Sequence, residues 1–252
     1  VGCTLNNNTL VINGTLTVTG GTLNVNGNVS MPSGGTFNQS GGNINVDGNA
    51  AGIAANSVAA GTKIISLFPA TLTSVNLTGG TLTIVDPHTS TSTTGNEVLY
   101  VNTGAVYGTL NVTSAHTIRF GNGVSTDAGG NTNGFFVNTW EGNGGMVFGN
   151  VIAEGPTGTN RTVVGTYQQP ISGNLTVNDG GHFAIASTYV NGNVLVNTGG
   201  TFTSTGATSL LGLLNSTFSN TAIEMVFVPS TNAQTVTNNG TIRNLATPTA
   251  NL

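Results

Sequence analysis

Charged side chains are scarce in this chain of 252 residues, of which only 5% are Asp, Glu, Lys or Arg. Typical soluble proteins contain about 25% of these residues. Proteins bind phosphate backbones and anionic membrane surfaces through clusters of basic residues, and here the basic residues are scattered singly. The sequence therefore predicts no nucleic-acid partner. The formal net charge is −4, and the basic residues are Lys63, Arg119, Arg161 and Arg243.

Cysteine and long apolar runs are also nearly absent. Cys3 is the single cysteine, so no disulfide can form within the chain and stability must come from packing. A free thiol is the expected state of Cys3, while lipidation and pairing with another chain stay open. No apolar run approaches the roughly 18 residues of a membrane span, which predicts no membrane insertion. The first residue is Val rather than Met, as in a secreted protein that has lost its signal peptide, so we expect an extracellular location.

Small and neutral polar residues replace the missing charges. The chain has 38 glycines and a surplus of Thr, Asn and Ser, while apolar residues still make up 37%. A disordered chain would combine low hydrophobicity with high net charge. The composition instead predicts a folded protein with a buried core and a neutral surface rich in hydroxyl and amide groups.

The most regular feature is a repeat near the N-terminus. The string "GTLTVTGGTLNVNGN" at residues 14–28 aligns with residues 35–49 at a shift of 21. Within each unit, apolar residues alternate over about five positions and Gly or Asn follows at the breaks, which indicates short strands joined by corners. Because identical residues recur one turn later, we expect the units to stack in register rather than pair as hairpins.

Stacking in register assigns alternate side chains to the inside and the outside. Leu16 is expected beneath Phe37, and Leu23 beneath Ile44, in aliphatic stacks with a rise of about 4.8 Å per rung. The intervening side chains are expected to form neutral ladders facing solvent, because a charge stacked at every rung would repeat the same repulsion. These outward residues are Thr15, Thr17, Thr22 and Asn24.

The repeat predicts an all-β fold, a right-handed parallel β-helix or β-solenoid with about 19–21 residues per coil. Near the C-terminus, residues 173–183 match residues 192–202 at a shift of 19. Between about 113 and 170 the pattern weakens, which we interpret as less regular rungs with longer corner loops. We therefore expect residues 1–252 to form a single elongated solenoid.

Several strings resemble the glycine- and asparagine-rich repeats of very large cell-surface proteins of Bacteroidota. These strings are "GTLTVTGGTLNVNGN", "GNLTVNDGG", "IRFGNG" and "EGPTGTNRTV". The family includes adhesins exported by the type IX secretion pathway and used in surface attachment or gliding. More loosely, the chain is similar to the β-solenoid stalks of haemagglutinin-type adhesins. The resemblance implies an extracellular, non-enzymatic role that is structural or adhesive.

A carbohydrate-active parallel β-helix enzyme, similar to a polysaccharide lyase or hydrolase, is the alternative. A glycosidase needs two carboxyl groups across one cleft. Glu141 and Glu154 could approach one another if loops fold together, and "DPH" (86–88) and "DGGH" (179–182) place an acid beside a histidine, although turns favour Asp, Pro and Gly. We assign no catalytic, cofactor or metal residue and expect no enzymatic activity. The acids, mostly isolated in sequence, are Asp47, Asp86, Glu97, Asp127, Glu141, Glu154, Asp179 and Glu224.

Aromatic residues offer a further candidate site. They could stack against a glycan, although a small core that anchors loops is the stronger expectation. Phe135 and Phe136 are adjacent, so they must point to opposite sides of a strand. An ice- or crystal-binding face would need regular Thr ranks, whereas Thr and Asn are mixed here. The aromatic candidates are Tyr100, Tyr107, Phe135, Phe136, Trp140 and Tyr167.

Neither end of the sequence resembles a cap for a solenoid, because both ends still follow the strand pattern with few charges. We therefore expect end-to-end self-association or continuation in a longer chain, with surface glycans as a further candidate partner. Together these observations predict a non-enzymatic rod segment of a cell-surface adhesin, filament or sheath.

Overall fold

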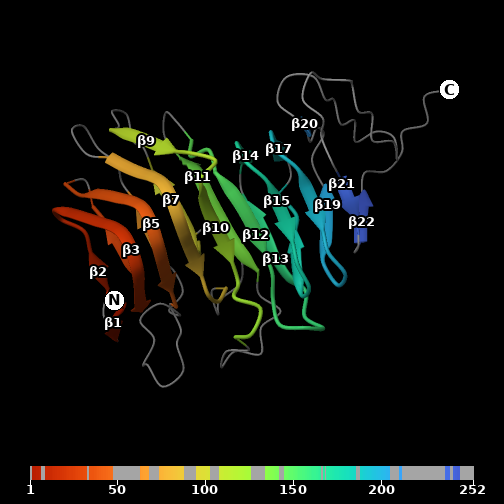
Figure 1. Ribbon diagram of the computed structural model, residues 1–252, viewed down its shortest axis with the longest axis horizontal. Helices are drawn as coiled ribbons and strands as arrows, with labels where there is room; N and C mark the ends of the chain where they lie inside the picture. The colour runs from red at the N-terminus through yellow and green to blue at the C-terminus, as the bar shows by residue number, and fades with distance from the viewer. Residues whose placement is uncertain are drawn as a thin grey trace.

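The computed structural model is built from strands, turns and bends, with no helix among the residues that it describes. These residues are 2–6, 9–32, 34–47, 63–67, 74–87, 95–102, 108–125, 134–141, 145–165, 167, 169–185, 188–204, 210–211, 236–238 and 241–244. Figure 1 shows the strands stacked side by side as successive rungs, from β1 to β21 and β22. Within this part of the chain, no helix is long and apolar enough to span a bilayer.

The strands alternate between two long sheets and a third, short one, and the pairs are parallel. The first sheet contains β1 (Gly2–Asn6), β3 (Thr15–Asn26), β5 (Thr36–Val46), β7 (Ser74–Ile84), β9 (Thr109–Val112), β10 (His116–Phe120), β12 (Asn150–Ala153), β15 (Leu175–Val177), β18 (Val194–Val196) and β21 (Val236–Asn238). The second contains β2 (Leu10–Val11), β4 (Val29–Met31), β6 (Ile65–Leu67), β8 (Leu99–Asn102), β11 (Phe135–Glu141), β13 (Arg161–Gly165), β16 (Gly181–Phe183), β19 (Thr201–Ser204) and β22 (Thr241–Asn244). The third contains β14 (Gln169–Ile171), β17 (Thr188–Val190) and β20 (Leu210–Leu211). This arrangement is a parallel β-solenoid, which confirms the predicted fold class.

The register confirms the stacking expected from the repeat. β3 pairs with β5 at an offset of 21, which places Leu16 beside Phe37 and Leu23 beside Ile44. β15 pairs with β18 at an offset of 19. Other coils are longer because residues are inserted at their corners: the offset is 38 between β5 and β7 and 33 between β10 and β12. The predicted length of 19–21 residues thus holds where the sequence repeats itself, whereas several other coils are longer, with an offset of 42 between β18 and β21.

The strands β3, β5 and β7 are long because each runs through a glycine pair at which the ladder is interrupted. The second glycine of each pair has a positive φ, for example 70° at Gly42 and 79° at Gly80. A Cβ atom on Gly42 would lie only 2.7 Å from the backbone carbon of Gly20. Both the left-handed backbone and the close approach of the neighbouring rung therefore require glycine here.

The core is a continuous stack of inward side chains along both long sheets. Val25, Val46 and Ile84 are fully buried neighbours in β3, β5 and β7. Leu16 and Leu23 are only partly buried, unlike their partners in β5. Leu23 pairs with Cys3, an exposed free thiol, so the outermost rung gives it little apolar cover.

Candidate functional site

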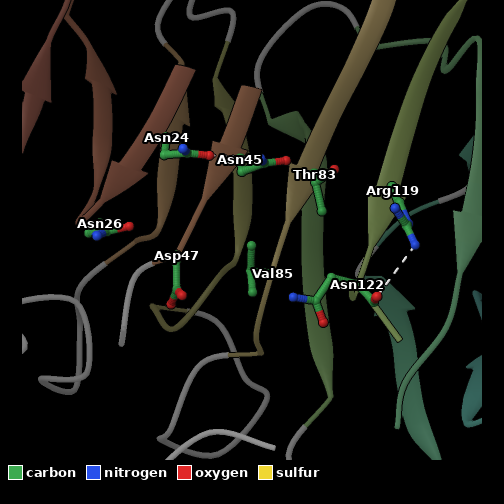
Figure 2. A pocket seen from close by; sticks show the side chains of 8 residues that line it. All are labelled: Asn24, Asn26, Asn45, Asp47, Thr83, Val85, Arg119 and Asn122. Carbon is green, nitrogen blue, oxygen red and sulfur yellow. Dashed lines mark hydrogen bonds between the residues drawn. The ribbon is translucent and has the colours of Figure 1, made fainter. Parts of the chain in front are cut away.

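A polar groove lies on the outer side of the first sheet, near the ends of its strands (Figure 2). Its volume is about 350 Å³. The lining side chains come from four successive rungs, so the groove follows the direction of stacking. All but one of them are polar: Asn24, Asn26, Asn45, Asp47, Thr83, Val85, Arg119 and Asn122.

Parallel register brings these residues together from distant parts of the sequence. Asn24, Asn45, Thr83 and Arg119 are neighbours in the strands β3, β5, β7 and β10. On the rungs of β3, β5 and β7, the residues two positions later also line the groove: Asn26, Asp47 and Val85. Residues two apart in an extended chain project from the same face, so the two ranks form adjacent parts of one lining.

The lining at the N-terminal end is a ladder of amides. Asn45 Nδ2 donates to Asn24 Oδ1 at 2.8 Å, and Asn24 Nδ2 donates to Thr4 Oγ1 at 3.3 Å. Each amide thus donates to the rung before it. The amide oxygen of Asn45, the last member of the series, is directed toward Thr83 (Figure 2). The ladder therefore presents an acceptor to the middle of the groove.

Asn122 lies at the opposite end of the groove. Its Oδ1 accepts hydrogen bonds from the backbone N–H groups of Val124 and Ser125, at 3.0 and 2.7 Å. These bonds fix the orientation of the amide because they occupy its oxygen. Figure 2 shows the amide nitrogen of Asn122 pointing back toward Val85. A donor at this end therefore faces the acceptors at the other.

The charge of Arg119 is balanced inside the protein. Its guanidinium forms an ion pair with Glu154 on the next rung, and Nη2 donates to the carbonyl of Asn122 at 3.4 Å. Glu154 also accepts from Asn178 Nδ2 at 2.9 Å, and Asn178 Oδ1 accepts from Asn197 Nδ2 at 2.7 Å. Asp47 is the other charged residue of the lining, so the groove has a weakly negative character.

Three acids of the sequence analysis are held in ion pairs that connect different rungs. Asp86 and Arg161 are both buried, with 3.2 Å between Oδ1 and Nη1, and Ser125 Oγ donates to Asp86 Oδ2 at 2.7 Å. Lys63 Nζ lies 3.6 Å from Glu97 Oε2, and Glu154 forms an ion pair with Arg119. These carboxylates therefore hold different rungs together.

The remaining acids and histidines are dispersed. Asp179 accepts a hydrogen bond from Thr157 at 2.7 Å. His182 occupies the outward position expected for it, beside Thr201 in the register and 3.1 Å from Thr162 Oγ1. Within the described part of the chain, no group of three or more His, Cys, Asp or Glu side chains could hold a metal ion. His88, Asp127 and Glu224 lie outside the described residues, as does the side chain of Glu141.

His116 forms a polar contact inside the solenoid that the sequence did not suggest. Its Nε2 lies 3.1 Å from Gln39 Oε1, and Gln39 Nε2 donates to the carbonyl of Thr81 at 3.0 Å. Both side chains are fully buried. Burial lowers the pKa of His116 from 6.5 to about 4, because the protonated ring would lose its hydration. The neutral imidazole is therefore part of the folded core at neutral pH.

The aromatic residues divide between the core and the surface. Phe135 packs in the core against Phe120, with 5.7 Å between ring centroids, whereas Phe136 is partly exposed on the other side of β11. This confirms that the two adjacent rings point to opposite sides. Tyr100 is buried beneath Lys63, whose Nζ lies 4.5 Å from the ring centroid. Tyr167 is 49% exposed, and Tyr107 and the side chain of Trp140 lie outside the described residues.

The groove was not among the sites expected from the sequence. The 21-residue shift aligns Asn24 with Asn45, so the repeat already indicated that these two amides are neighbours. Arg119 and Asn122 lie outside any exact repeat, and their place in the groove depends on corner insertions that the sequence pattern does not measure. No protein-family model, no curated protein and no solved structure matches the chain.

Proposed function

We propose that the chain is a non-enzymatic, extracellular β-solenoid that serves as a rod segment of a cell-surface adhesin, filament or sheath. The observation that carries this proposal is the continuous parallel pairing from β1 to β21, combined with a nearly neutral outer surface. Each rung extends such a rod by about 4.8 Å. The length of such a rod therefore increases with the number of rungs in the sequence.

The outer ladders support an extended structural role. Asn24 with Asn45, and Asn38 with Asn76, are joined across rungs by amide hydrogen bonds of 2.8 Å. Neutral ladders avoid the repulsion that stacked charges would accumulate along a rod. The resemblance of the repeats to Bacteroidota surface proteins points to the same setting outside the cell.

The use of the acids supports a non-enzymatic role. Asp86, Glu97 and Glu154 are engaged by Arg161, Lys63 and Arg119, respectively. A carboxylate whose oxygens already contact a cation of the protein is engaged in a structural contact, and a glycosidase needs two carboxyl groups that face the substrate across one cleft. The polysaccharide-cleaving alternative has no comparable support.

In this proposal, the edge strands β1 and β2 receive further rungs, either from the same polypeptide or from a second copy stacked end to end. Edge strands offer unpaired backbone groups to any extended segment in register. The exposed Cys3 lies on β1, so a Cys3–Cys3 crosslink between two purified copies would report a contact between their two β1 edges.

Immunogold electron microscopy of intact source cells tests the proposal. Antibodies raised against the purified chain are expected to label fibres or a sheath outside the cell, without permeabilisation. Labelling confined to the cytoplasm would contradict the proposal. Release of reducing ends or unsaturated uronates from polysaccharides by the purified chain would contradict its non-enzymatic part, and Asp86→Asn would then be the first variant to assay.

A further inference from the structure

We propose that the groove formed by the strand ends of β3, β5, β7 and β10 binds a short segment of a neutral saccharide. The inference rests on the proposed adhesive function and gives it a ligand class. The groove combines ordered hydrogen-bonding groups, a carboxylate and an apolar residue between them.

Donors and acceptors face one another across the groove. The carboxylate of Asp47 and the amide oxygen of Asn45 lie on one side, and the amide nitrogen of Asn122 points toward them from the other (Figure 2). A sugar hydroxyl both donates and accepts a hydrogen bond. Two neighbouring hydroxyls on one ring can therefore satisfy both sides at once, which a purely anionic or purely cationic ligand cannot do.

These groups are held in place before any ligand arrives. Asn45 is fixed by its bond to Asn24, and Asn122 by the two backbone N–H groups that occupy its oxygen. Their backbones belong to paired strands or to a turn directly after one. Groups that are already ordered lose less conformational entropy on binding, so a small ligand with few contacts can still be retained.

The charge of the groove selects against acidic sugars. Arg119 is compensated by Glu154, and Asp47 places a carboxylate in the lining. A uronate or a sulfated sugar would place its own negative charge near this carboxylate. Val85 lies between the polar sides and is 8% exposed, so it offers a small apolar contact for the C–H face of a pyranose ring. The volume of about 350 Å³ is at the small end of the usual range for ligand pockets.

Isothermal titration calorimetry with the purified 252-residue chain tests this inference. The probes are maltotetraose, cellotetraose and mannotetraose, with tetragalacturonate as the acidic counterpart, all in buffer containing EDTA. We expect saturable binding of at least one neutral tetrasaccharide and none of tetragalacturonate. Side-chain amide resonances of Asn45 and Asn122 are expected to shift in NMR spectra on the same titration.

Asp47→Ala is expected to weaken binding at least about tenfold, since a hydrogen bond to a charged group is lost. Asp179→Ala is the matched control, because Asp179 lies at a later strand end of the same sheet, outside the groove, and its carboxylate accepts a hydrogen bond from Thr157. This control variant is expected to bind as the parent does. Circular dichroism confirms that both variants are folded.

Three results would overturn the inference. In the first, the folded chain binds none of the neutral probes. In the second, it binds one with an affinity that Asp47→Ala leaves unchanged. In the third, no saccharide binds, and a separate calcium titration without EDTA shows binding that Asp47→Ala abolishes, which would assign the groove to a cation. Failure of saccharide binding with immunogold label still on surface fibres would leave the proposed function standing. Saccharide binding by a chain found only in the cytoplasm would remove that function instead.

Discussion

The rungs formed by β3 and β5 and those formed by β7 to β13 share one parallel core but are joined by different side-chain contacts. Between β3 and β5 the sequence repeats at an offset of 21 and a neutral amide ladder joins the rungs. Between β7 and β13 the offsets exceed 30 at β10 and β12, and ion pairs join the rungs. Where the corners lengthen, fewer identical residues stack, although Asn76 still donates to Asn38 at an offset of 38. Paired charges there add to the ladders.

Three of the few basic residues of the chain lie in the region with long corners. Lys63, Arg119 and Arg161 each pair with an acid on another rung, and all three pairs lie in the part of the solenoid that has long corners. An ion pair needs only two residues and no repetition, so it tolerates corners of unequal length. A ladder needs the same residue type on successive rungs.

The largest effect is expected from breaking the buried pair of the irregular region. Arg161→Ala should lower the free energy of unfolding by about 3–5 kcal/mol, because Asp86 would keep a buried charge without its partner. Urea denaturation followed by circular dichroism measures this loss. The double variant Arg161→Met with Asp86→Leu should recover most of it, since it removes both charges. A double variant as unstable as the single one would show that the region does not depend on charge pairing.

The sequence predicted the regular rungs well and the irregular rungs poorly, for a physical reason. Alternation and the exact shift of 21 fix which residues of β3 and β5 are neighbours, so the pairing of Leu16 with Phe37 could be read directly. The contact of Asp86 with Arg161 joins residues 75 positions apart across corners of unequal length. Nothing local in the sequence encodes such a distance. The groove combines both kinds of rung, which is why only its Asn24–Asn45 half was visible in the repeat.

Acid should destabilise the junction between the two regions through His116, which contacts Gln39 of β5 from β10. Above about pH 6.5 the ring is neutral in both the folded and the unfolded chain, so it does not affect stability. As the pH falls from about 6.5 to about 4, the unfolded chain takes up a proton that the folded chain refuses. Stability should therefore fall by about 3 kcal/mol over this interval.

Comparison with His116→Gln isolates this contribution from that of the carboxylates. The variant keeps a group that can donate to Gln39 but cannot titrate. Denaturant midpoints measured at several pH values should decline less steeply in the variant between about pH 6.5 and 4. Parallel profiles would mean that His116 is not the residue that links acid to stability.

A smaller loss, about 2 kcal/mol, is expected for Gly42→Ala in the regular region. The new Cβ would force a side chain into a backbone with φ of 70° and against the carbonyl oxygen of Gly21, 2.7 Å away. Gly14→Ala is the control, because a Cβ there meets no atom within 4 Å. Thermal melting should separate the two variants clearly. Equal melting temperatures would show that the glycine bend can relax, and that the regular rungs are less tightly specified than their repeat implies.

The smallest effects are expected from two outward asparagines, one in a neutral amide ladder and one bonded to a carboxylate. Asn45→Ala removes one neutral hydrogen bond, to Asn24 at 2.8 Å, and should reduce the free energy of unfolding by about 0.5 kcal/mol, since the site is partly open to water. Asn178→Ala removes a donor to the Glu154 carboxylate at 2.9 Å as well as an acceptor for Asn197, and should cost about 1.5 kcal/mol. The difference arises because Asn178 makes two bonds, one of which goes to a charged group and is stronger than a bond between two amides. If urea denaturation gave Asn45→Ala the larger loss, the neutral amide ladder would stabilise the solenoid more than the hydrogen bond to the Glu154 carboxylate does.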